Sequence, residues 1–114
     1  MSIIKISVIT ITYNAENVIM RTLDSVLKQT FSNIEHIIID GASKDSTLLA
    51  EREYESRSCS TNNGHEIKII SEPDKGLYDA MNKGIGKATG NYLVFLNAGD
   101  VFSSPSTLET VADM

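Results

Sequence analysis

Aspartates that directly follow apolar segments are the side chains best placed to do chemistry. Asp40 comes after three isoleucines and before a glycine, and Asp100 lies just beyond the apolar run Tyr92–Leu96. In an open α/β sheet, ligands bind in the crevice outside the carboxyl ends of the strands. We therefore expect Asp40 to accept a hydrogen bond from a nucleobase N–H or a ribose hydroxyl, because an ionised carboxylate is a strong acceptor. The alternative role for Asp40 is to cap a helix or a turn.

Asp100 is the candidate metal ligand. It closes the turn Asn97–Asp100, which follows the apolar run. A cation such as Mg²⁺ is usually held by one or two protein carboxylates, while phosphates and water supply its other oxygen ligands. We expect Asp100 to hold Mg²⁺ or Mn²⁺ against a diphosphate. The alternative is an ordinary surface aspartate.

Three weaker candidates accompany these aspartates. The ring of Tyr13 could stack on a flat base, or it could pack on the following helix. Thr12 precedes it, but threonine is common in strands for steric reasons alone. Asp79 shares a helix face with Asn82, where it could contact a nucleotide or a donor sugar. Its place in the first helical turn equally suits the helix dipole.

Strands that alternate with helices would bring these residues together. Such alternation predicts right-handed βαβ units and a parallel sheet. We expect an α/β fold with Rossmann-like nucleotide-binding topology and strand order 3-2-1-4, which gathers Thr12, Tyr13, Asp40 and Asp100 along one rim. The expected strands are Ile4–Thr12, Ile34–Ile39, Glu66–Ile70 and Tyr92–Leu96. The expected helices are Asn17–Gln29, a helix from Ser43 or Asp45 to about Glu55, Tyr78–Ala88, and a last helix that starts at Ser104–Pro105 or, alternatively, at a capping box of Ser106 and Glu109.

Several local features can also be predicted. Asn14 is a plausible N-cap of the first helix. Arg57–Gly64 is polar and is expected to be a mobile loop. The unbroken apolar run Tyr92–Leu96 predicts a strand covered on both faces. The third helix is expected to bury a stripe made of Tyr78, Met81, Ile85 and Ala88.

The totals describe one ordinary globular domain. The chain has 114 residues, of which 41% are hydrophobic and 22% charged, and its net charge is −5. This acidic balance argues against a nucleic-acid partner, because binding many phosphates needs a basic surface. Cys59 is the single cysteine, so no internal disulfide can form, as suits a reducing compartment. No apolar run approaches the length of a bilayer crossing and no signal-peptide pattern is present, so we expect a cytoplasmic protein.

Two familiar kinds of site are not encoded. Gly84, Gly86 and Gly90 follow a helix, whereas the dinucleotide fingerprint links the first strand to its helix. His36 and His65 have no partner at metal-ligand spacing.

Four stretches together resemble family 2 glycosyltransferases of the GT-A fold, which use nucleotide-diphosphate sugars. They occur in the family's order and spacing over nearly the whole chain, as Val8–Asn14, Ile39–Thr47, Ser71–Gly84 and Gly90–Asp100. The resemblance implies that Thr12 and Tyr13 line the base pocket and that Asp40 holds uracil or another base. It further implies a nucleotide-diphosphate sugar as partner, with a UDP-sugar as the first choice.

The resemblance also assigns the acidic residues near the phosphates. Asp79 would lie near the ribose or the diphosphate. The turn that ends in Asp100 occupies the place of the family's Asp-x-Asp metal motif, which implies Mg²⁺ or Mn²⁺ as cofactor. Asn97 and Gly99 stand where aspartates are often found, so Asp100 is the remaining carboxylate.

Family catalytic domains are roughly twice this length, within the usual size of one domain. Residues 1–114 would therefore form a single nucleotide-sugar-binding domain, the N-terminal portion of a longer catalytic domain. An inverting transferase needs a general base that takes the proton of the acceptor hydroxyl. We expect that base beyond Met114, so the 114-residue chain alone should be inactive. The resemblance implies surface polysaccharide synthesis, in the cytoplasm or at the inner face of the membrane.

Other hypotheses remain beside this one. A non-catalytic nucleotide- or partner-binding module of the same fold is the main alternative. A receiver-like phospho-acceptor centred on Asp40 is a poor one, because acidic residues should then end the first strand, where Thr12, Tyr13 and Asn14 stand. If the sheet ends at Tyr92–Leu96, that edge exposes unpaired backbone. We then expect self-association or a homodimer there, or burial of the edge by the last helix.

Overall fold

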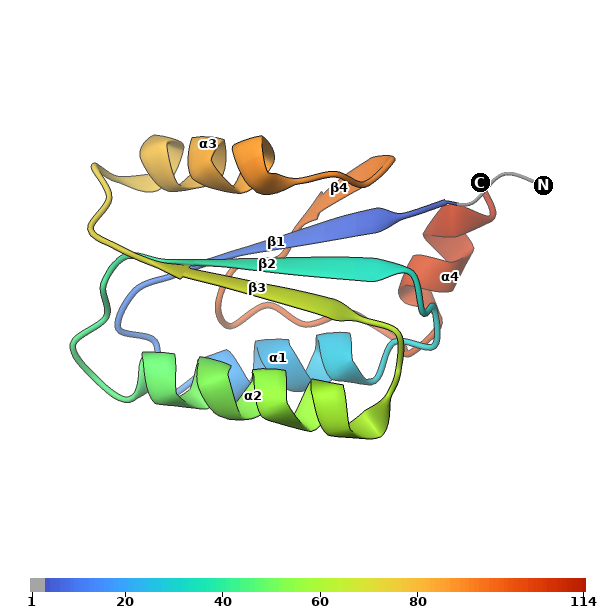
Figure 1. Cartoon of the computed structure of the whole chain (residues 1–114), viewed down its shortest axis with the longest axis horizontal. Helices are drawn as coiled ribbons and strands as arrows, with labels where there is room; N and C mark the ends of the chain where they lie inside the picture. The colour runs from blue at the N-terminus through green and yellow to red at the C-terminus, as the bar shows by residue number, and fades with distance from the viewer. Residues whose placement is uncertain (1–3) are drawn as a thin grey trace.

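Four parallel strands form the sheet of this protein. The computed structural model describes residues 4–114, and within them the sheet has the order β3-β2-β1-β4, as expected from the sequence (Figure 1). The central strands β1 and β2 are buried along almost their whole length. The strands are β1 (Ile6–Thr12), β2 (Ile34–Asp40), β3 (Glu66–Ser71) and β4 (Tyr92–Phe95).

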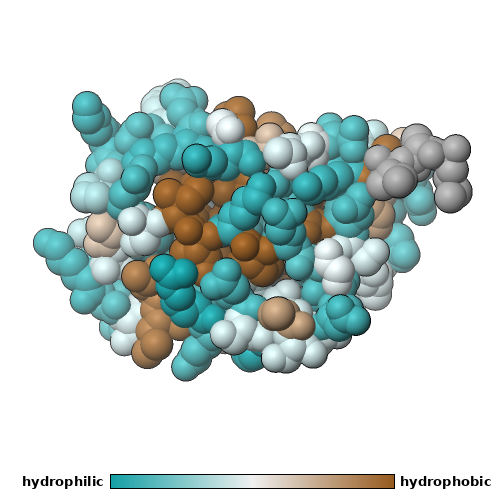
Figure 2. Space-filling view, viewed as in Figure 1, coloured by the Kyte–Doolittle hydropathy of each residue, from teal (hydrophilic) through white to brown (hydrophobic). Residues whose placement is uncertain are grey.

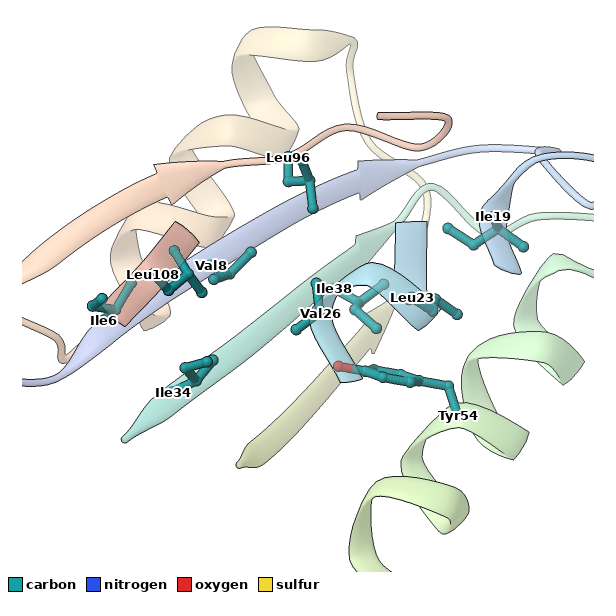
Figure 3. Close-up of a cluster of buried hydrophobic side chains, with 10 residues drawn as sticks. All are labelled: Ile6, Val8, Ile19, Leu23, Val26, Ile34, Ile38, Tyr54, Leu96 and Leu108. Atoms are coloured by element: carbon teal, nitrogen blue, oxygen red, sulfur yellow. The ribbon is translucent and has the colours of Figure 1, made fainter. Parts of the chain in front are cut away.

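Helices cover the two faces unequally. Figure 1 shows α1 and α2 together on one face of the sheet and α3 on the other. The helices are α1 (Ile19–Leu27), α2 (Thr47–Thr61), α3 (Leu77–Lys87) and α4 (Thr107–Ala112). The short helix α4 inserts Leu108 among the buried side chains of the α1 face, near Ile6 (Figure 3). Within residues 4–114, no helix has both the length and the apolar character needed to cross a membrane.

The core is divided by the sheet. On the α1 and α2 face, side chains of β1 and β2 pack against Leu23, Val26 and Tyr54 (Figure 3). On the other face, a smaller cluster joins isoleucines of the sheet to Ala80 of α3. Gly84 allows α3 to approach closely, because a Cβ there would lie 2.5 Å from Cγ2 of Ile9.

Helix α2 extends beyond its expected end. The prediction of a loop over Arg57–Gly64 is wrong for its first half, because the helix continues to Thr61 and ends at Asn62 in the left-handed conformation, with φ of 52°. The buried face explains the error. Its residues are polar, so no apolar stripe marks the helix, and they are Thr47, Glu51, Tyr54 and Ser58.

The expected buried stripe of α3 is wrong for Tyr78 and Ile85, while Ala88 does pack against the buried cluster on that face. Tyr78 is 84% exposed and Ile85 is exposed as well, while Ala80 and Gly84 face the sheet. Small residues on that face let the helix lie close to the strands, and the larger apolar residues point away.

Strand β4 is not covered on both faces. Tyr92, Leu93 and Phe95 are exposed, because β4 is an edge strand and α3 packs over β1 and β2 instead. The opposite edge strand, β3, holds half-buried isoleucines. Figure 2 shows hydrophobic atoms in the middle of the viewed face, between polar surfaces above and below.

The helix starts differ from the expected caps. Helix α1 begins at Ile19, so Asn14 is not its N-cap, and Asn14 has φ of 48°. Its side-chain oxygen instead accepts a hydrogen bond from the backbone N–H of Lys44 at 2.8 Å. Helix α4 begins at Thr107, so its N-cap position is the alternative Ser106 and not Ser104, but the Ser106 side chain makes no capping hydrogen bond.

Candidate functional site

Backbone pairing brings the ends of the strands to one rim, as the parallel topology requires. Thr12 lies opposite Asp40 in the β1–β2 register, and Asp40 lies opposite Ser71 in the β2–β3 register. The pairing continues past the strands, since Gly41 N–H donates to Thr12 C=O and Glu72 N–H donates to Asp40 C=O, both at 3.0 Å. The loops that follow β1, β2 and β3 are therefore held side by side.

Asp40 lies beneath this rim. Its side chain is fully buried, and its Oδ2 accepts hydrogen bonds from Ser43 N–H at 2.8 Å and from the Ser71 hydroxyl at 3.0 Å. Its Oδ1 accepts one from the Ser43 hydroxyl at 2.7 Å. The Ser43 Oγ in turn accepts from Asn14 N–H at 2.9 Å. Asp40 thus ties together the loops after β1, β2 and β3.

Above Asp40, a hollow of about 400 Å³ opens to solvent. Its lining comes from the loops after β1, β2 and β3, namely Tyr13, Gly41, Ala42, Lys44, Pro73 and Asp74. Tyr13 is 56% exposed and offers a free ring. A Cβ on Gly41 would lie 2.9 Å from Oδ2 of Asp74 and 3.3 Å from Cδ1 of Tyr13. The ring and the carboxylate therefore meet at the glycine, where they can stack a flat group and accept its N–H.

A smaller hollow of about 250 Å³ adjoins the first. It shares Tyr13 and Asp74 and continues along Thr12 to the start of α3. Thr12 is buried, and its hydroxyl oxygen has no hydrogen-bond partner among the described residues. Thr12 and Tyr13 therefore lie at the predicted rim.

Asp79 stabilises the turn that carries Asp74. Its Oδ2 accepts a hydrogen bond from Lys75 N–H at 2.9 Å and lies 3.6 Å from the Lys83 ammonium. The hydrogen bond from Lys75 is the main reason that the pKa of Asp79 is below its usual value. The Lys83 ammonium also donates to Pro73 C=O at 3.0 Å. This network fixes the turn whether or not Asp79 touches a ligand.

Asp100 lies in a separate turn after β4. Its N–H donates to Asn97 C=O at 2.9 Å, while Gly99 has φ of 97° and donates its N–H to the Thr22 hydroxyl at 2.8 Å. Ala98 N–H reaches Ile11 C=O at 3.3 Å, which places this turn beside the end of β1. Asp100 and Asn97 are both exposed.

The oxygen donors of this turn could provide part of the coordination of a divalent cation. Residues 4–114 hold no group of three or more His, Cys, Asp or Glu side chains that could enclose a metal ion. Asp100 and Asn97 would supply two oxygens, so the remaining ligands would have to be phosphate and water. That division fits Mg²⁺, which is often held by only one or two carboxylates and substrate phosphates.

Asp74 was missed by the sequence reasoning as a site residue. The available signal was its position between a proline and a glycine just past β3, at the same rim as Tyr13. Such a turn position is common for solvated aspartates, so the convergence on Tyr13 and Gly41 emerges only in three dimensions.

Comparisons with known proteins all point to glycosyltransferases. The model of the family described as Glycosyl transferase family 2 matches residues 7–114. A PGL/p-HBAD biosynthesis glycosyltransferase of Mycobacterium bovis is 38% identical over 106 residues, which are 93% of this chain and 40% of the relative. A glycosyltransferase of Mycobacterium tuberculosis that is called uncharacterized is 42% identical over 104 residues, covering 90% of this chain and 37% of the relative.

Solved structures are similar over almost the whole chain. Staphylococcus aureus TarS 1–349 in complex with UDP-GlcNAc has a TM-score of 0.78 and 28% identity, and the match covers 96% of this chain and 30% of TarS. The mannosyltransferase PcManGT of Pyrobaculum calidifontis, in complex with GDP-Man and Mn²⁺, has a TM-score of 0.81 and 27% identity. The match covers 96% of this chain and 31% of PcManGT. This chain thus spans less than half the length of the proteins that it matches.

Proposed function

Because the chain belongs to glycosyl transferase family 2, we propose that the hollow at its strand ends binds the nucleotide of a nucleotide-diphosphate sugar. The observation that carries this proposal is the meeting of Tyr13, Gly41 and Asp74 at the carboxyl ends of parallel strands. The fold expected from the sequence motifs, that of GT-A glycosyltransferases, agrees with the likeness to TarS and PcManGT. Those two proteins are in complex with UDP-GlcNAc and with GDP-Man.

The pocket chemistry favours bases that carry a ring N–H. Tyr13 would stack on the base, and Asp74 would accept the N3–H of uracil or the N1–H of guanine. The matching ring nitrogens of cytosine and adenine are acceptors, which the carboxylate would repel. Thr12 would line the pocket beside Tyr13. Asp40, which the sequence predicts to hold the base, is fully buried and accepts hydrogen bonds from Ser43 and Ser71, so it would support the pocket from below and leave the base contact to Asp74. We take a UDP-sugar as the first choice of donor.

The diphosphate would lie between α3 and the turn after β4. Asp100, with the Asn97 amide oxygen, would hold Mg²⁺ or Mn²⁺ there, and Asp79 would lie near the ribose or the diphosphate. When bound, the cation would neutralise charge on the diphosphate as it becomes the leaving group.

The whole reaction is sugar transfer to an acceptor in surface polysaccharide synthesis, with inversion at the anomeric carbon. A general base would take the proton of the acceptor hydroxyl as its oxygen attacks that carbon and the nucleoside diphosphate leaves. None of residues 4–114 is assigned this base, which we place beyond Met114. The 114-residue chain alone would therefore bind donor without transferring sugar. We place the protein in the cytoplasm or at the inner face of the membrane.

Calorimetric titration with UDP, GDP, CDP and ADP, each with and without Mn²⁺, tests the proposal. We expect UDP or GDP to bind and CDP and ADP to bind much less. Asp74→Asn should weaken UDP binding about tenfold, because a hydrogen bond to a charged group contributes about 1.5–3 kcal/mol and the neutral amide oxygen would keep only about 0.5–1.5 kcal/mol of it. Glu53→Gln, on the exposed face of α2, is the matched control and should bind like the unchanged protein. Failure of all four nucleotides to bind would refute the proposal.

A non-catalytic nucleotide-binding module is the second candidate, because the turn Asn97–Asp100 offers a single carboxylate. The same titrations separate the two candidates. A donor site should bind UDP more tightly with Mn²⁺ and lose that gain in Asp100→Ala. Equal affinity with and without Mn²⁺ would favour the module.

A further inference from the structure

Helix α2 turns a polar face toward the sheet. Two of its buried residues, Glu51 and Tyr54, are three positions apart and so share that face. The Tyr54 hydroxyl and His36 Nδ1 form a hydrogen bond of 2.7 Å, and His36 Nε2 forms another of 2.7 Å with the Thr10 hydroxyl. Polar groups of α2 thus meet polar groups that β1 and β2 direct to the same side.

Glu51 lies one helical turn closer to the strand ends. It is fully buried, and neither of its carboxyl oxygens accepts a hydrogen bond from an N–H or O–H group of the described residues. Asp40 lies four residues after His36, so the two share a face of β2. Glu51 of α2 therefore faces Asp40 of β2, just as Tyr54 of α2 faces His36 of β2. The carboxyl groups of Glu51 and Asp40 are both fully buried.

A carboxyl group in this position has one good way to satisfy its oxygens. Burial, followed by the neighbouring Asp40, raises the pKa of Glu51 to about 9. Two carboxyl groups that share a buried site hold one proton between them. The protonated group then has an O–H to donate, and the ionised group is its acceptor.

We propose that Glu51 is a positioning residue that donates a hydrogen bond from its protonated carboxyl group to Asp40, and thereby holds the wall of the nucleotide pocket formed by residues 41–45. This inference rests on the proposed function, because it takes that pocket as the nucleotide site. Asp40 connects Glu51 to the pocket wall, because it accepts hydrogen bonds from both the N–H and the hydroxyl of Ser43. Gly41 and Ala42, which line the pocket, lie between Asp40 and Ser43.

The charged groups around Glu51 define what its ionisation would do. Asp40 on β2 and Asp45 before α2 disfavour a charge on Glu51, while Arg52 on α2 favours it. From α1, Asp24 reaches α2, where it pairs with Arg57 further along the helix. A second buried negative charge would repel Asp40. Ser43 and the pocket wall would then shift as the two carboxylates separate or admit water.

Titration of UDP over a range of pH tests this inference in the intact 114-residue chain. Affinity should be level from pH 6 to 8 and fall above pH 9, by up to about tenfold per pH unit. Uracil also loses its ring proton in the alkaline range, so each measurement is compared with Glu51→Gln at the same pH. Glutamine keeps the shape and an N–H donor but cannot ionise. This variant should match the unchanged protein at pH 7 and bind UDP more tightly than it above pH 9.

Glu51→Leu separates positioning from simple packing. It fills similar space without a donor, so UDP binding at pH 7 should weaken several-fold while the urea midpoint of unfolding stays the same or rises. A parallel fall in UDP affinity for the unchanged protein and Glu51→Gln between pH 7 and 10 would overturn the inference.

The two proposals fail in distinguishable ways. If no nucleotide binds at pH 7, the proposed function fails and the positioning role falls with it. Urea unfolding then still decides whether Glu51 holds a shared proton. The unchanged protein should lose stability relative to Glu51→Gln between pH 7 and 9.5, and equal losses would refute the carboxyl pair.

Discussion

Three buried titratable side chains differ in whether they carry a charge in the folded protein. Burial opposes the charge on Glu35, but hydrogen bonds from Lys68, Ser7 and Thr89 outweigh burial and lower its pKa to about 2. His36 has no such compensation, so burial lowers its pKa to about 3 and the ring stays neutral. Glu51 also stays neutral, by remaining protonated. A charge is thus kept only where several donors surround it.

These shifts predict how stability depends on pH. The folded pKa values of Glu35 and His36 lie below the usual 4.5 and 6.5, so the unfolded chain binds their protons first and stability falls as the pH drops through those values. The folded pKa of Glu51 lies above its usual 4.5, so its contribution is lost as the pH rises from about 4.5 to about 9. Each group changes the free energy of unfolding by at most about 1.4 kcal/mol per pH unit.

We therefore expect the free energy of unfolding in urea to be greatest between about pH 4.5 and 6.5, where the effects of His36 and Glu51 oppose each other. It should decline on both sides. Glu51→Gln should reduce the loss of stability at alkaline pH and leave the loss of stability at acid pH unchanged. A monotonic rise in stability from pH 5 to 9 would contradict the raised pKa of Glu51.

At the scale of elements, the approach of α3 to the sheet depends on one glycine. Gly84 faces Ile9, and a methyl group there would lie 2.5 Å from Cγ2 of that isoleucine. Gly86 lies two residues on, and a Cβ there would meet nothing within 4 Å. The two positions offer a matched pair within one helix.

Gly84→Ala should destabilise the protein by about 1–3 kcal/mol, because the added carbon overpacks the interface between α3 and the sheet. Gly86→Ala should instead stabilise it by up to about 1 kcal/mol, because alanine is the better helix former. Midpoints of urea unfolding measure both effects. Since α3 follows the turn that carries Asp74, Gly84→Ala should also weaken UDP binding. Equal stability of the two variants would show that α3 is free to move outward.

The order of the sheet could be predicted because isoleucine-rich segments alternate with helix signals and crossovers are right-handed. The same rule placed Thr12, Tyr13 and Asp40 at one rim. The buried faces of α2 and α3 could not be predicted, because α2 buries polar side chains and α3 buries its smallest ones. The position of Asp74 could not be predicted either. It depends on a turn stabilised by Asp79 and Lys83, which no periodic pattern encodes.

At the scale of the whole molecule, the two ends of the sheet differ in structure. At the amino ends, the charged Glu35 of β2 joins β1, β3 and the segment before β4 through Ser7, Lys68 and Thr89. At the carboxyl ends, the loops form open hollows around Tyr13 and Asp74. Rigid pairing at one end thus supports a site built from loops at the other.

The edge at β4 carries the last prediction. Its pairing within the described sheet is to β1 alone, and Leu93 and Phe95 are exposed beside it. The last helix does not bury this edge, because Tyr92, Leu93 and Phe95 stay exposed while α4 packs Leu108 into the core on the α1 face. An open edge strand with apolar neighbours is a template for pairing with another chain. We therefore expect the 114-residue chain to self-associate through β4 at high concentration.

Sedimentation velocity over a concentration series measures this association. Leu93→Lys and Phe95→Lys should each shift the chain toward monomer, because a charge on an edge strand opposes pairing with a second strand. Leu49→Lys removes an apolar side chain that is 62% exposed on α2, away from this edge, and should leave association unchanged. If all three variants and the unchanged chain sediment as monomers at every concentration, the edge is not an association surface. If Leu49→Lys alone dissociates the chain, the contact lies on α2.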